Sequence, residues 1–273
     1  GRGGSIIDLC MRLEGCTLLE AIRHLGRNAP DDTAYSSRND FAPNNFQPSM
    51  AANGARKLIS ISDTLPPHLQ EYLTKVRCIN LENAKPFLKC ISYEVKGRCY
   101  QAIGFSNPSG GYELRDSGSF KGTIAPKDIT PIFTDKQTAH TTDKRQPICV
   151  FEGFMDFLSF LSMKEEITNH CLVMNSVSNV ARTVRYLSDR HLTHIRAFLD
   201  NDDAGRKAVG ELIRAGFKVE DMSVYYKDFK DLNEFYVSRV REQKKFRAQE
   251  QIQVSTSEQY QDRKSKQVKH KMR

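Results

Sequence analysis

The fold is decided by two stretches, ICVFEGFMD at residues 148–156 and AFLDNDDAG at residues 197–205. In each stretch an apolar run rich in β-branched and aromatic residues is followed at once by acidic residues and glycine. Such a run predicts a buried strand that ends at a polar edge. Two further apolar runs follow the same plan, so we expect four strands, at Ile148–Phe151, Leu172–Met174, Ile195–Leu199 and Met222–Tyr226.

A helical pattern follows each expected strand, at residues 154–164, 179–189, 204–215 and 232–241. Strands that alternate with helices at this spacing are typical of parallel βαβ units. Gly216 is well placed to end the third helix, and Asp203, beside Ala204, is the expected cap at its start. The predicted fold class is therefore α/β, with a Rossmann-like parallel sheet and flanking helices.

Polar residues follow each expected strand, and three of the four strands are followed by carboxylates. In open parallel sheets ligands bind beyond the carboxyl ends of the strands, so these groups should gather at one edge. Clustered carboxylates raise each other's pKa unless a cation lies among them, and oxygen ligands suit Mg²⁺. The groups after the strands are Glu152, Asn175, Asp200 with Asp202, and Asp228.

Each acidic residue taken alone also has a plain structural interpretation. An acid after a strand, such as Glu152, is often a solvated turn residue. The acids from Asp200 onward can cap the next helix, and Asp231 with Glu234 has the spacing of a capping box. The order of all these groups at successive strand ends favours a joint chemical role.

The two acidic stretches are similar to the signature motifs of Toprim domains, the catalytic module of bacterial DNA primases, type IA and type II topoisomerases and some nucleases. The order Glu-Gly-aromatic-Met-Asp most resembles the primase branch. The resemblance implies that Glu152, Asp200 and Asp202 are catalytic and bind Mg²⁺ or Mn²⁺. It also implies a further metal-binding acid after the fourth strand, where we assign Asp228 and leave Asp231 as an alternative.

Residues 58–145 predict a small α+β unit before the Toprim domain at 146–240. Its expected helices are at about 67–76 and 81–88. Residues 91–95 and 100–105 alternate as strands do, and Lys96-Gly97 between them predicts a turn. This unit resembles the subdomain that precedes Toprim in primases, which carries basic residues for template and nucleotide. The resemblance implies that Arg115, Lys121 and Lys127 bind nucleic acid or nucleotide, although Arg115 and Lys127 are also open to a structural role.

Residues 1–26 resemble the last part of a primase-type zinc-binding domain, so Zn²⁺ is expected only in a missing upstream part. Residues 27–57 contain no Leu, Ile or Val, and this composition predicts a flexible linker. Because the chain begins with Gly rather than Met, we expect a piece of a longer protein.

Charge is concentrated at the end of the 273-residue chain, which has a net charge of +8. Residues 241–273 hold ten basic and four acidic side chains and so carry +6 of that total. Such a basic tail suits a nucleic-acid partner through counterion release, although a solvated extension without a partner remains open.

Three function classes are excluded or disfavoured by composition. No stretch of the sequence approaches the ~20 consecutive apolar residues of a membrane span. No N-terminal segment has the charged and then apolar pattern of a signal peptide. The seven cysteines lack C-x-x-C spacing, which argues against a disulfide framework and a complete zinc site. We therefore expect a cytoplasmic protein without a membrane partner.

The resemblance implies a DNA primase, a nucleotidyl transferase of mobile-element type that makes RNA primers on single-stranded DNA from ribonucleotides. A replicative helicase is a candidate partner. Two alternatives stay open: a Toprim-type nuclease that uses the same carboxylates, and a non-catalytic DNA-binding accessory protein. A topoisomerase is not expected, because it needs a nucleophilic Tyr on a separate large domain.

Overall fold

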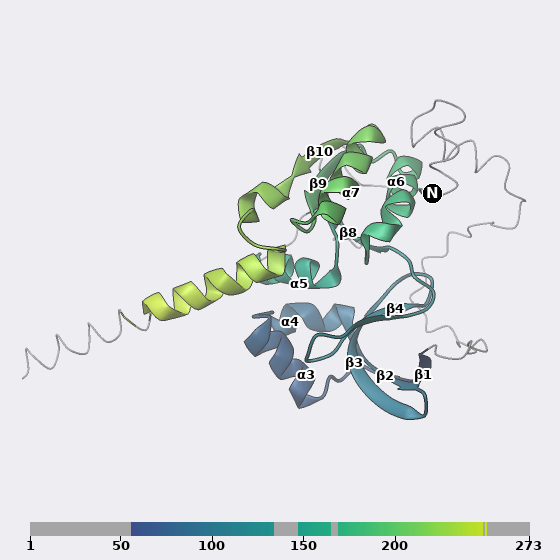
Figure 1. The fold of residues 1–273 in the computed structure, drawn as a ribbon, viewed down its shortest axis with the longest axis vertical. Coiled ribbons are helices and arrows are strands. Elements are labelled where there is room, and N and C mark those ends of the chain that lie inside the picture. Colours follow the sequence, from purple (N-terminus) through teal and green to yellow (C-terminus); the bar gives the residue numbers. More distant parts are fainter. Residues whose placement is uncertain (1–55, 134–146, 165–168, 248, 250–273) are drawn as a thin grey trace, which may run out of the picture.

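The structure is a computed structural model, and it describes residues 56–133, 147–164, 169–247 and 249. Two five-stranded sheets form its framework, with a layer of helices between them (Figure 1). The expected zinc-domain remnant and nearly all of the linker lie outside the described residues, as does the tail from residue 250 onward.

The first sheet is antiparallel throughout, in the order β1-β2-β3-β4-β5. Between β1 and β2 the chain forms two short helices, each followed by a tighter or wider helical turn. The bounds are β1 (Lys57–Ser62), α3 (Pro67–Glu71), a π-helical turn (Tyr72–Val76), α4 (Leu81–Ala84), a 3₁₀ turn (Lys85–Phe87), β2 (Leu88–Val95), β3 (Arg98–Ser106), β4 (Tyr112–Arg115) and β5 (Lys121–Ile124).

The predicted turn between β2 and β3 is confirmed at Lys96 and Gly97. Both residues have positive φ values, 50° and 76°. Two consecutive positive φ angles are what a two-residue hairpin turn needs to match the twist of its strands, and glycine adopts them at no steric cost.

The second sheet has the order β10-β9-β7-β8-β6, and all its pairs are parallel except that of β6 with β8. The predicted α/β class is therefore confirmed. The bounds are β6 (Thr130–Ile132), β7 (Ile148–Phe151), α5 (Phe154–Met163), β8 (Cys171–Val173), a 3₁₀ turn (Val177–Asn179), α6 (Val180–Asp189), β9 (His194–Phe198), α7 (Asp203–Arg214), β10 (Lys218–Asp221), a second 3₁₀ turn (Met222–Tyr226) and a final helix over residues 232–247.

The prediction of a strand at Met222–Tyr226 is wrong, because that segment is a 3₁₀ turn and the strand lies just before it in β10. Glu220 holds β10 beside β9: it accepts hydrogen bonds from Arg196 Nε at 2.8 Å and lies 2.6 Å from His194 Nε2. In the following turn Tyr226 is buried, whereas Tyr225 is 73% exposed. Because only some side chains of this apolar run are buried, the run does not form a buried strand.

One apolar core joins the two sheets. Residues of the first sheet, such as Phe105, and of α5, such as Phe154 and Phe157, belong to the same buried cluster. The rings of Phe105 and Phe154 stack with centroids 5.2 Å apart. A second core lies between the other face of the parallel sheet and helices α6 and α7. Helix α5 is therefore packed between the two sheets (Figure 1).

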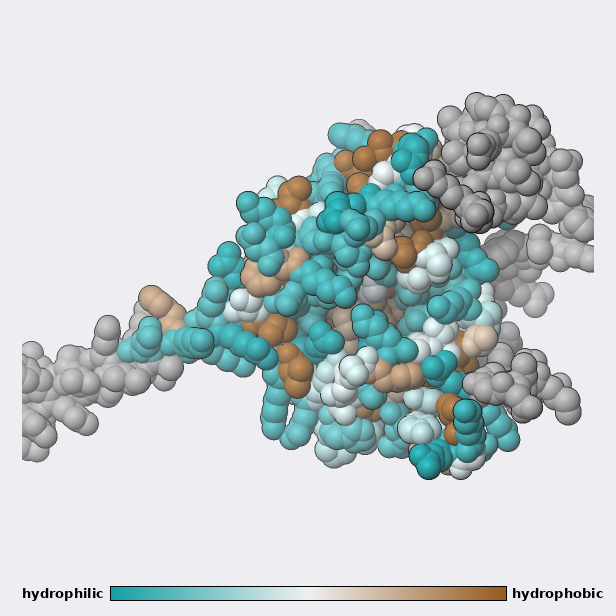
Figure 2. All heavy atoms as spheres, in the orientation of Figure 1, coloured by the Kyte–Doolittle hydropathy of each residue, from teal (hydrophilic) through white to brown (hydrophobic). Residues whose placement is uncertain are grey.

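The final helix extends away from the body of the protein (Figure 1). Its first turn is buried at Leu232 and Asn233, whereas Phe246 near its end is 62% exposed. The helix therefore continues beyond the predicted end at residue 241 and into the first part of the basic tail. Figure 2 shows this face of the molecule as largely hydrophilic, with apolar side chains in small scattered patches.

Within the described ranges, no helix combines the length and the hydropathy that a membrane crossing requires.

Candidate active site

Glu152 and Asp200 meet at the carboxyl edge of the parallel sheet. Glu152 follows β7 and Asp200 comes two residues after β9, and these two strands are direct parallel neighbours. The backbone amide of Asp200 donates a 3.1 Å hydrogen bond to Glu152 Oε2. The structure thus joins two of the three predicted carboxylates by this hydrogen bond, and the charge of the third, Asp202, acts on both.

These two carboxylates are hard to ionise in the absence of a cation. Burial raises the pKa of Glu152, and the charge of Asp202 adds to that rise. Burial and the charge of Glu152 raise the pKa of Asp200 to about 7. Desolvation and like-charge repulsion both favour the neutral carboxyl, so a positive charge at this edge would be bound favourably.

Asp202, rather than Asp203, caps helix α7, which corrects our prediction. Asp202 has an extended backbone, and its Oδ1 accepts a 2.9 Å hydrogen bond from the amide of Gly205. Asp203 is already the first residue of the helix and pairs with Arg206 at 2.6 Å on the surface. Asp202 is exposed and leaves its second carboxylate oxygen available at the same edge.

Gly205 lets the start of α7 pack directly against the backbone of Asp200. A Cβ on Gly205 would overlap the carbonyl oxygen of Asp200 and crowd its amide. The glycine of the second acidic motif therefore sets how closely the helix approaches the carboxylate-bearing turn.

Asp156 is a buried acid of this site to which the sequence analysis gave no role. It lies in the first turn of α5, four residues after Glu152, and its Oδ1 accepts a 3.2 Å hydrogen bond from the amide of Asn233. Burial and the charges of Asp231, Asp200 and Glu152 raise its pKa well above the usual value. Its place as the last residue of the Glu-Gly-aromatic-Met-Asp motif, in the first turn of the helix that follows Glu152, was the signal that could have identified it.

Asn233 ties the start of the final helix to the core beneath the site. Its side-chain amide donates to the Ser159 hydroxyl at 2.9 Å and to the Arg77 carbonyl at 3.1 Å. Its Oδ1 accepts from the Arg77 guanidinium at 2.9 Å. No sequence pattern indicated this residue, because its partners lie 74 and 156 positions away in the chain.

Lys121 from the first sheet and Lys230 from the loop before the final helix bring positive charge to the carboxylates. Both lower the pKa of Glu152, and Lys230 also lowers that of Asp200, against the larger effect of burial. The sequence analysis predicted Lys121 as a site residue but missed Lys230, which lies between two acids in a loop.

Arg115 lies opposite Lys121 in the β4–β5 register and beside α5. Its guanidinium is 5.4 Å from the centre of the Phe154 ring and donates a 3.0 Å hydrogen bond to the Leu114 carbonyl. Burial lowers its pKa, and the charges of Glu113, Tyr72 and Asp156 oppose that shift. Arg115 therefore packs against Phe154 and also places a positive charge near the buried Asp156.

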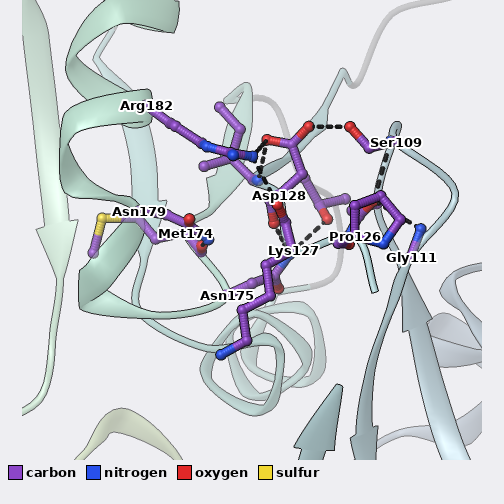
Figure 3. Close-up of polar contacts among 12 residues, drawn as sticks. Ser109, Gly111, Pro126, Lys127, Asp128, Met174, Asn175, Asn179 and Arg182 are labelled. Carbon is purple, nitrogen blue, oxygen red and sulfur yellow. Dashed lines mark hydrogen bonds and ion pairs between the residues drawn. The ribbon is translucent and has the colours of Figure 1, made fainter. Parts of the chain in front are cut away.

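Lys127 lies elsewhere, beside a network centred on Asp128 that joins the two sheets (Figure 3). Asp128 accepts hydrogen bonds from the Ser109 hydroxyl and, at 3.2 Å, from Arg182, which also donates to the Lys127 carbonyl at 2.7 Å. The Lys127 side chain is exposed and points away from this network. Its charge lowers the pKa of Glu113, against the rise that burial causes.

Asn175, which follows β8, belongs to the same network rather than to the carboxylates. Its amide donates to the Asp128 carbonyl and to the Thr130 hydroxyl, each at 2.9 Å. Its backbone adopts a φ of 63°, which asparagine tolerates better than most residues. Asn175, which follows β8, therefore fixes the connection between the two sheets.

The loop before the final helix offers Asp228 and Asp231. Asp228 is exposed and follows a 3₁₀ turn, not a strand. Asp231 caps the final helix, because its Oδ1 accepts a 2.7 Å hydrogen bond from the amide of Glu234. Glu234 in turn accepts from the amide of Lys230 at 2.7 Å, so the predicted capping pair is confirmed. The charge of Asp231 also raises the pKa of Asp200.

The donor set fits a divalent ion that is shared with phosphate. Among the described residues, no three or more His, Cys, Asp or Glu side chains form a ligand group for one ion. Mg²⁺ in phosphoryl-transfer sites is usually held by one or two carboxylates, and waters and phosphates complete its shell. Glu152 and Asp200 meet that requirement, since they are neighbouring oxygen donors whose repulsion a cation would relieve.

Comparison with known proteins gives two family matches. Residues 58–125 match a domain of unknown function (DUF8464), and residues 149–236 match the Toprim-like family. A search of curated proteins finds no match to the chain.

Two solved structures from bacteriophage T7 are similar to parts of the chain. One is the primase fragment of the primase-helicase protein, with 18% identity and a TM-score of 0.46 over 70% of this chain and 78% of that one. The other is the lagging-strand DNA polymerase interacting with primase domains of two gp4 subunits bound to an RNA/DNA hybrid and dTTP. It shows 19% identity and a TM-score of 0.42 over 60% of this chain and 83% of that one.

The Toprim-like match covers β8, β9, β10 and all but the first residue of β7, together with both acidic turns and the start of the final helix. Residues 149–236 of this chain are a Toprim-like domain.

Proposed function

We propose that the protein is a primase-like nucleotidyl transferase that joins ribonucleotides into a primer on single-stranded DNA. The observation that carries the proposal is the contact between Glu152 and Asp200 at the ends of adjacent parallel strands, with Lys121 of the first sheet near enough for its charge to lower the pKa of Glu152. A carboxylate pair can hold a metal ion, and a basic residue from the other sheet can hold a phosphate group. The arrangement therefore suits a phosphate-bearing substrate that binds together with a metal ion.

Each residue of the site has a distinct task in this proposal. Glu152 and Asp200 would hold a Mg²⁺ or Mn²⁺ ion, which supplies charge neutralisation for the nucleotide phosphates when it is bound. Asp202 adds a third carboxylate at the rim. Lys121 binds phosphate next to Glu152, and Arg115 supports that position from the neighbouring strand.

For the acid beyond the fourth strand we favour Asp231 over Asp228. Asp231 is half-buried and electrostatically coupled to Asp200 and to Asp156, whereas Asp228 is exposed. Because Asp231 also caps the final helix, substitution by Asn keeps the cap and removes only the charge.

The decisive experiment compares an Asp200→Asn, Asp202→Asn double variant with the unchanged protein in two assays. One assay follows ribonucleotide incorporation on single-stranded DNA with Mg²⁺ or Mn²⁺, and the other follows cleavage of the same DNA. We expect incorporation in the unchanged protein and its loss in the double variant. Asp203→Asn is the matched control, because the Asp203 side chain is exposed and pairs with Arg206 of its own helix.

Three outcomes would contradict the proposal in different ways. Metal-dependent cleavage without incorporation would identify a nuclease. DNA binding without either activity would identify an accessory protein. Unchanged activity and metal affinity in the double variant would show that the carboxylates are not the site.

A further inference from the structure

The first sheet carries a stacked set of aromatic rings that the carboxylate site does not use. Tyr93 and Tyr100 are register partners on β2 and β3, with ring centroids 5.6 Å apart and planes 24° apart. The Phe120 ring follows at 6.2 Å from Tyr93, with an interplanar angle of 19°. We call these three residues the aromatic ladder.

The ladder is held rigidly by its surroundings. Asp116 Oδ1 accepts hydrogen bonds from the amides of Gly118 and Phe120, at 2.8 and 3.1 Å, and so fixes the turn that carries Phe120. The guanidinium of Arg56 lies 5.0 Å from the centre of the Phe120 ring. Gly122 provides the space, because a Cβ there would overlap the Phe120 ring.

One end of the ladder is open to solvent. Tyr93 is only 4% exposed, whereas Tyr100 is 43% exposed. A flat ligand can therefore extend the stack on Tyr100 without any rearrangement of the rings below it.

The charge around the ladder is positive. Arg56 lies against the Phe120 ring, Lys96 is in the β2–β3 turn, and Arg98 on β3 shares the face of Tyr93 and Tyr100. The nearby acid Asp116 already accepts hydrogen bonds from two backbone amides. A ligand with flat rings and a negative backbone complements this surface, which is the composition of single-stranded nucleic acid. The exposed basic residues at this surface are Lys96 and Arg98.

The ladder is also connected to the carboxylate edge. β5 is the edge strand of its sheet, and Phe120 directly precedes Lys121 at the start of that strand. Successive residues of an extended chain point to opposite faces. Phe120 therefore belongs to the ladder on one face, while Lys121 faces Glu152 on the other.

We propose that the aromatic ladder is a base-stacking platform for single-stranded nucleic acid, which passes round the β5 edge to reach Lys121 and the carboxylates. The path to the carboxylates rests on the proposed function, whereas the stacking on Tyr100 does not. Stacking tolerates every base, so the platform binds without sequence preference.

A direct test exploits the absence of tryptophan from the chain. Tyr100→Trp keeps an aromatic ring and makes it the only tryptophan reporter of the full 273-residue protein. Titration with a 12-nucleotide oligothymidylate, in EDTA and without nucleotides, should quench its fluorescence. Tyr225→Trp is the matched control, since Tyr225 is also exposed but lies on the turn after β10, away from the ladder.

Two further measurements separate stacking from charge. An abasic oligonucleotide of the same length should bind by charge but leave the reporter unquenched. Tyr100→Ala should weaken oligothymidylate binding about fivefold or more, with the melting temperature nearly unchanged, because the removed ring is largely exposed. Tyr100→Phe should restore binding, since it keeps the stacking surface.

Defined results would overturn the proposal. If oligothymidylate binds but does not quench the Tyr100→Trp reporter, the ladder is not the platform. If the reporter changes with protein concentration alone, the surface joins two copies of the chain instead. If Tyr100→Ala lowers stability and leaves affinity unchanged, the ladder is only a packing element.

The test is independent of catalysis. If the Tyr100→Trp reporter is quenched but the unchanged protein makes no primer, the platform proposal stands and the primase proposal is rejected. A protein that makes primers while Tyr100→Ala binds like the unchanged chain rejects the platform alone.

Discussion

The amide of Asp200 reaches across from the end of β9 to hydrogen-bond the carboxylate of Glu152 at the end of β7. The backbone of one acidic motif thus positions the side chain of the other. Because β7 and β9 are paired in parallel register, any slip of one strand would separate the two carboxylates. The geometry of the site is therefore fixed by the sheet itself, and not by flexible side chains.

The first prediction concerns pH. The folded pKa of Asp200, about 7, lies above the unfolded value of about 3.9. A raised folded pKa gives stability that is fully present below the unfolded pKa and is lost as the pH rises through 7. Asp200→Asn stays neutral, so in EDTA the variant should be more stable than the unchanged protein at pH 8, by on the order of 1–3 kcal/mol.

The difference in stability between the Asp200→Asn variant and the unchanged protein should be smaller at pH 5, because Asp200 is largely protonated in the folded protein at that pH. Thermal melting at the two pH values measures it, and Asp203→Asn serves as the exposed control. An equal difference at both pH values would show that the charge of Asp200 does not cause it.

The second prediction concerns the glycine of the second acidic motif. Gly205→Ala forces a Cβ into the Asp200 backbone and should cost about 1–3 kcal/mol of stability, with a loss of metal affinity. A Cβ at Gly210, on the same helix, meets the Arg214 guanidinium, whose nearest atom, Nη1, is 3.4 Å away. Gly210→Ala should stabilise the protein by about 0.5–1 kcal/mol, because alanine is the better helix former.

Chemical denaturation and metal titration of both glycine variants test this pair. Equal effects of the two substitutions would contradict the close approach of α7 to Asp200.

The third prediction separates the two basic residues whose roles the sequence left open. Arg115 packs on the Phe154 ring, so Arg115→Ala should lower stability by about 1 kcal/mol as well as DNA binding. Lys127 is exposed, so Lys127→Ala should leave the melting temperature unchanged. If Lys127 contacts a phosphate, its loss should reduce the salt slope of single-stranded DNA binding by ~0.7.

Melting curves and DNA titrations at several salt concentrations check both variants. A stability loss at Lys127 with no effect at Arg115 would reverse the assignment.

The fourth prediction concerns the basic tail. Deletion of residues 246–273 removes seven basic and three acidic side chains. Since Phe246 is 62% exposed, the melting temperature should change little. Single-stranded DNA binding should weaken, most strongly at low salt, where the Debye length is ~30 Å at 0.01 M.

The tail effect should be the same for all DNA sequences, because phosphate contacts carry no base information. Fluorescence anisotropy at 0.01 M and 0.1 M salt, about 30 and 10 Å of Debye length, tests it. Equal binding by the intact and shortened proteins at both salts would make the tail a solvated extension.

Local sequence patterns predicted most of the second sheet. The strand at Ile148–Phe151 and the turn at Lys96-Gly97 are where the patterns placed them, because burial and turn chemistry are local properties. The strand at Lys57–Ser62 was not predicted individually: it is an exposed edge strand with an irregular register, so it lacks a clear alternation.

The finer features of the site depend on contacts that no local pattern contains. Asp202 and Asp203 are equally good caps by composition, and only the backbone conformation selects Asp202. The role of Asn233 depends on Arg77, 156 residues earlier. The carboxylates could thus be named from the sequence, whereas their supporting residues could not.

The stacking of Phe105 on Phe154 bears on how this protein can change over evolution. Two family models divide the chain between residues 125 and 149, yet the rings meet across that division. A gene rearrangement that replaced either half would leave an aromatic face without its counterpart. The two halves must therefore be inherited together, or each exchange must bring a matching aromatic surface with it.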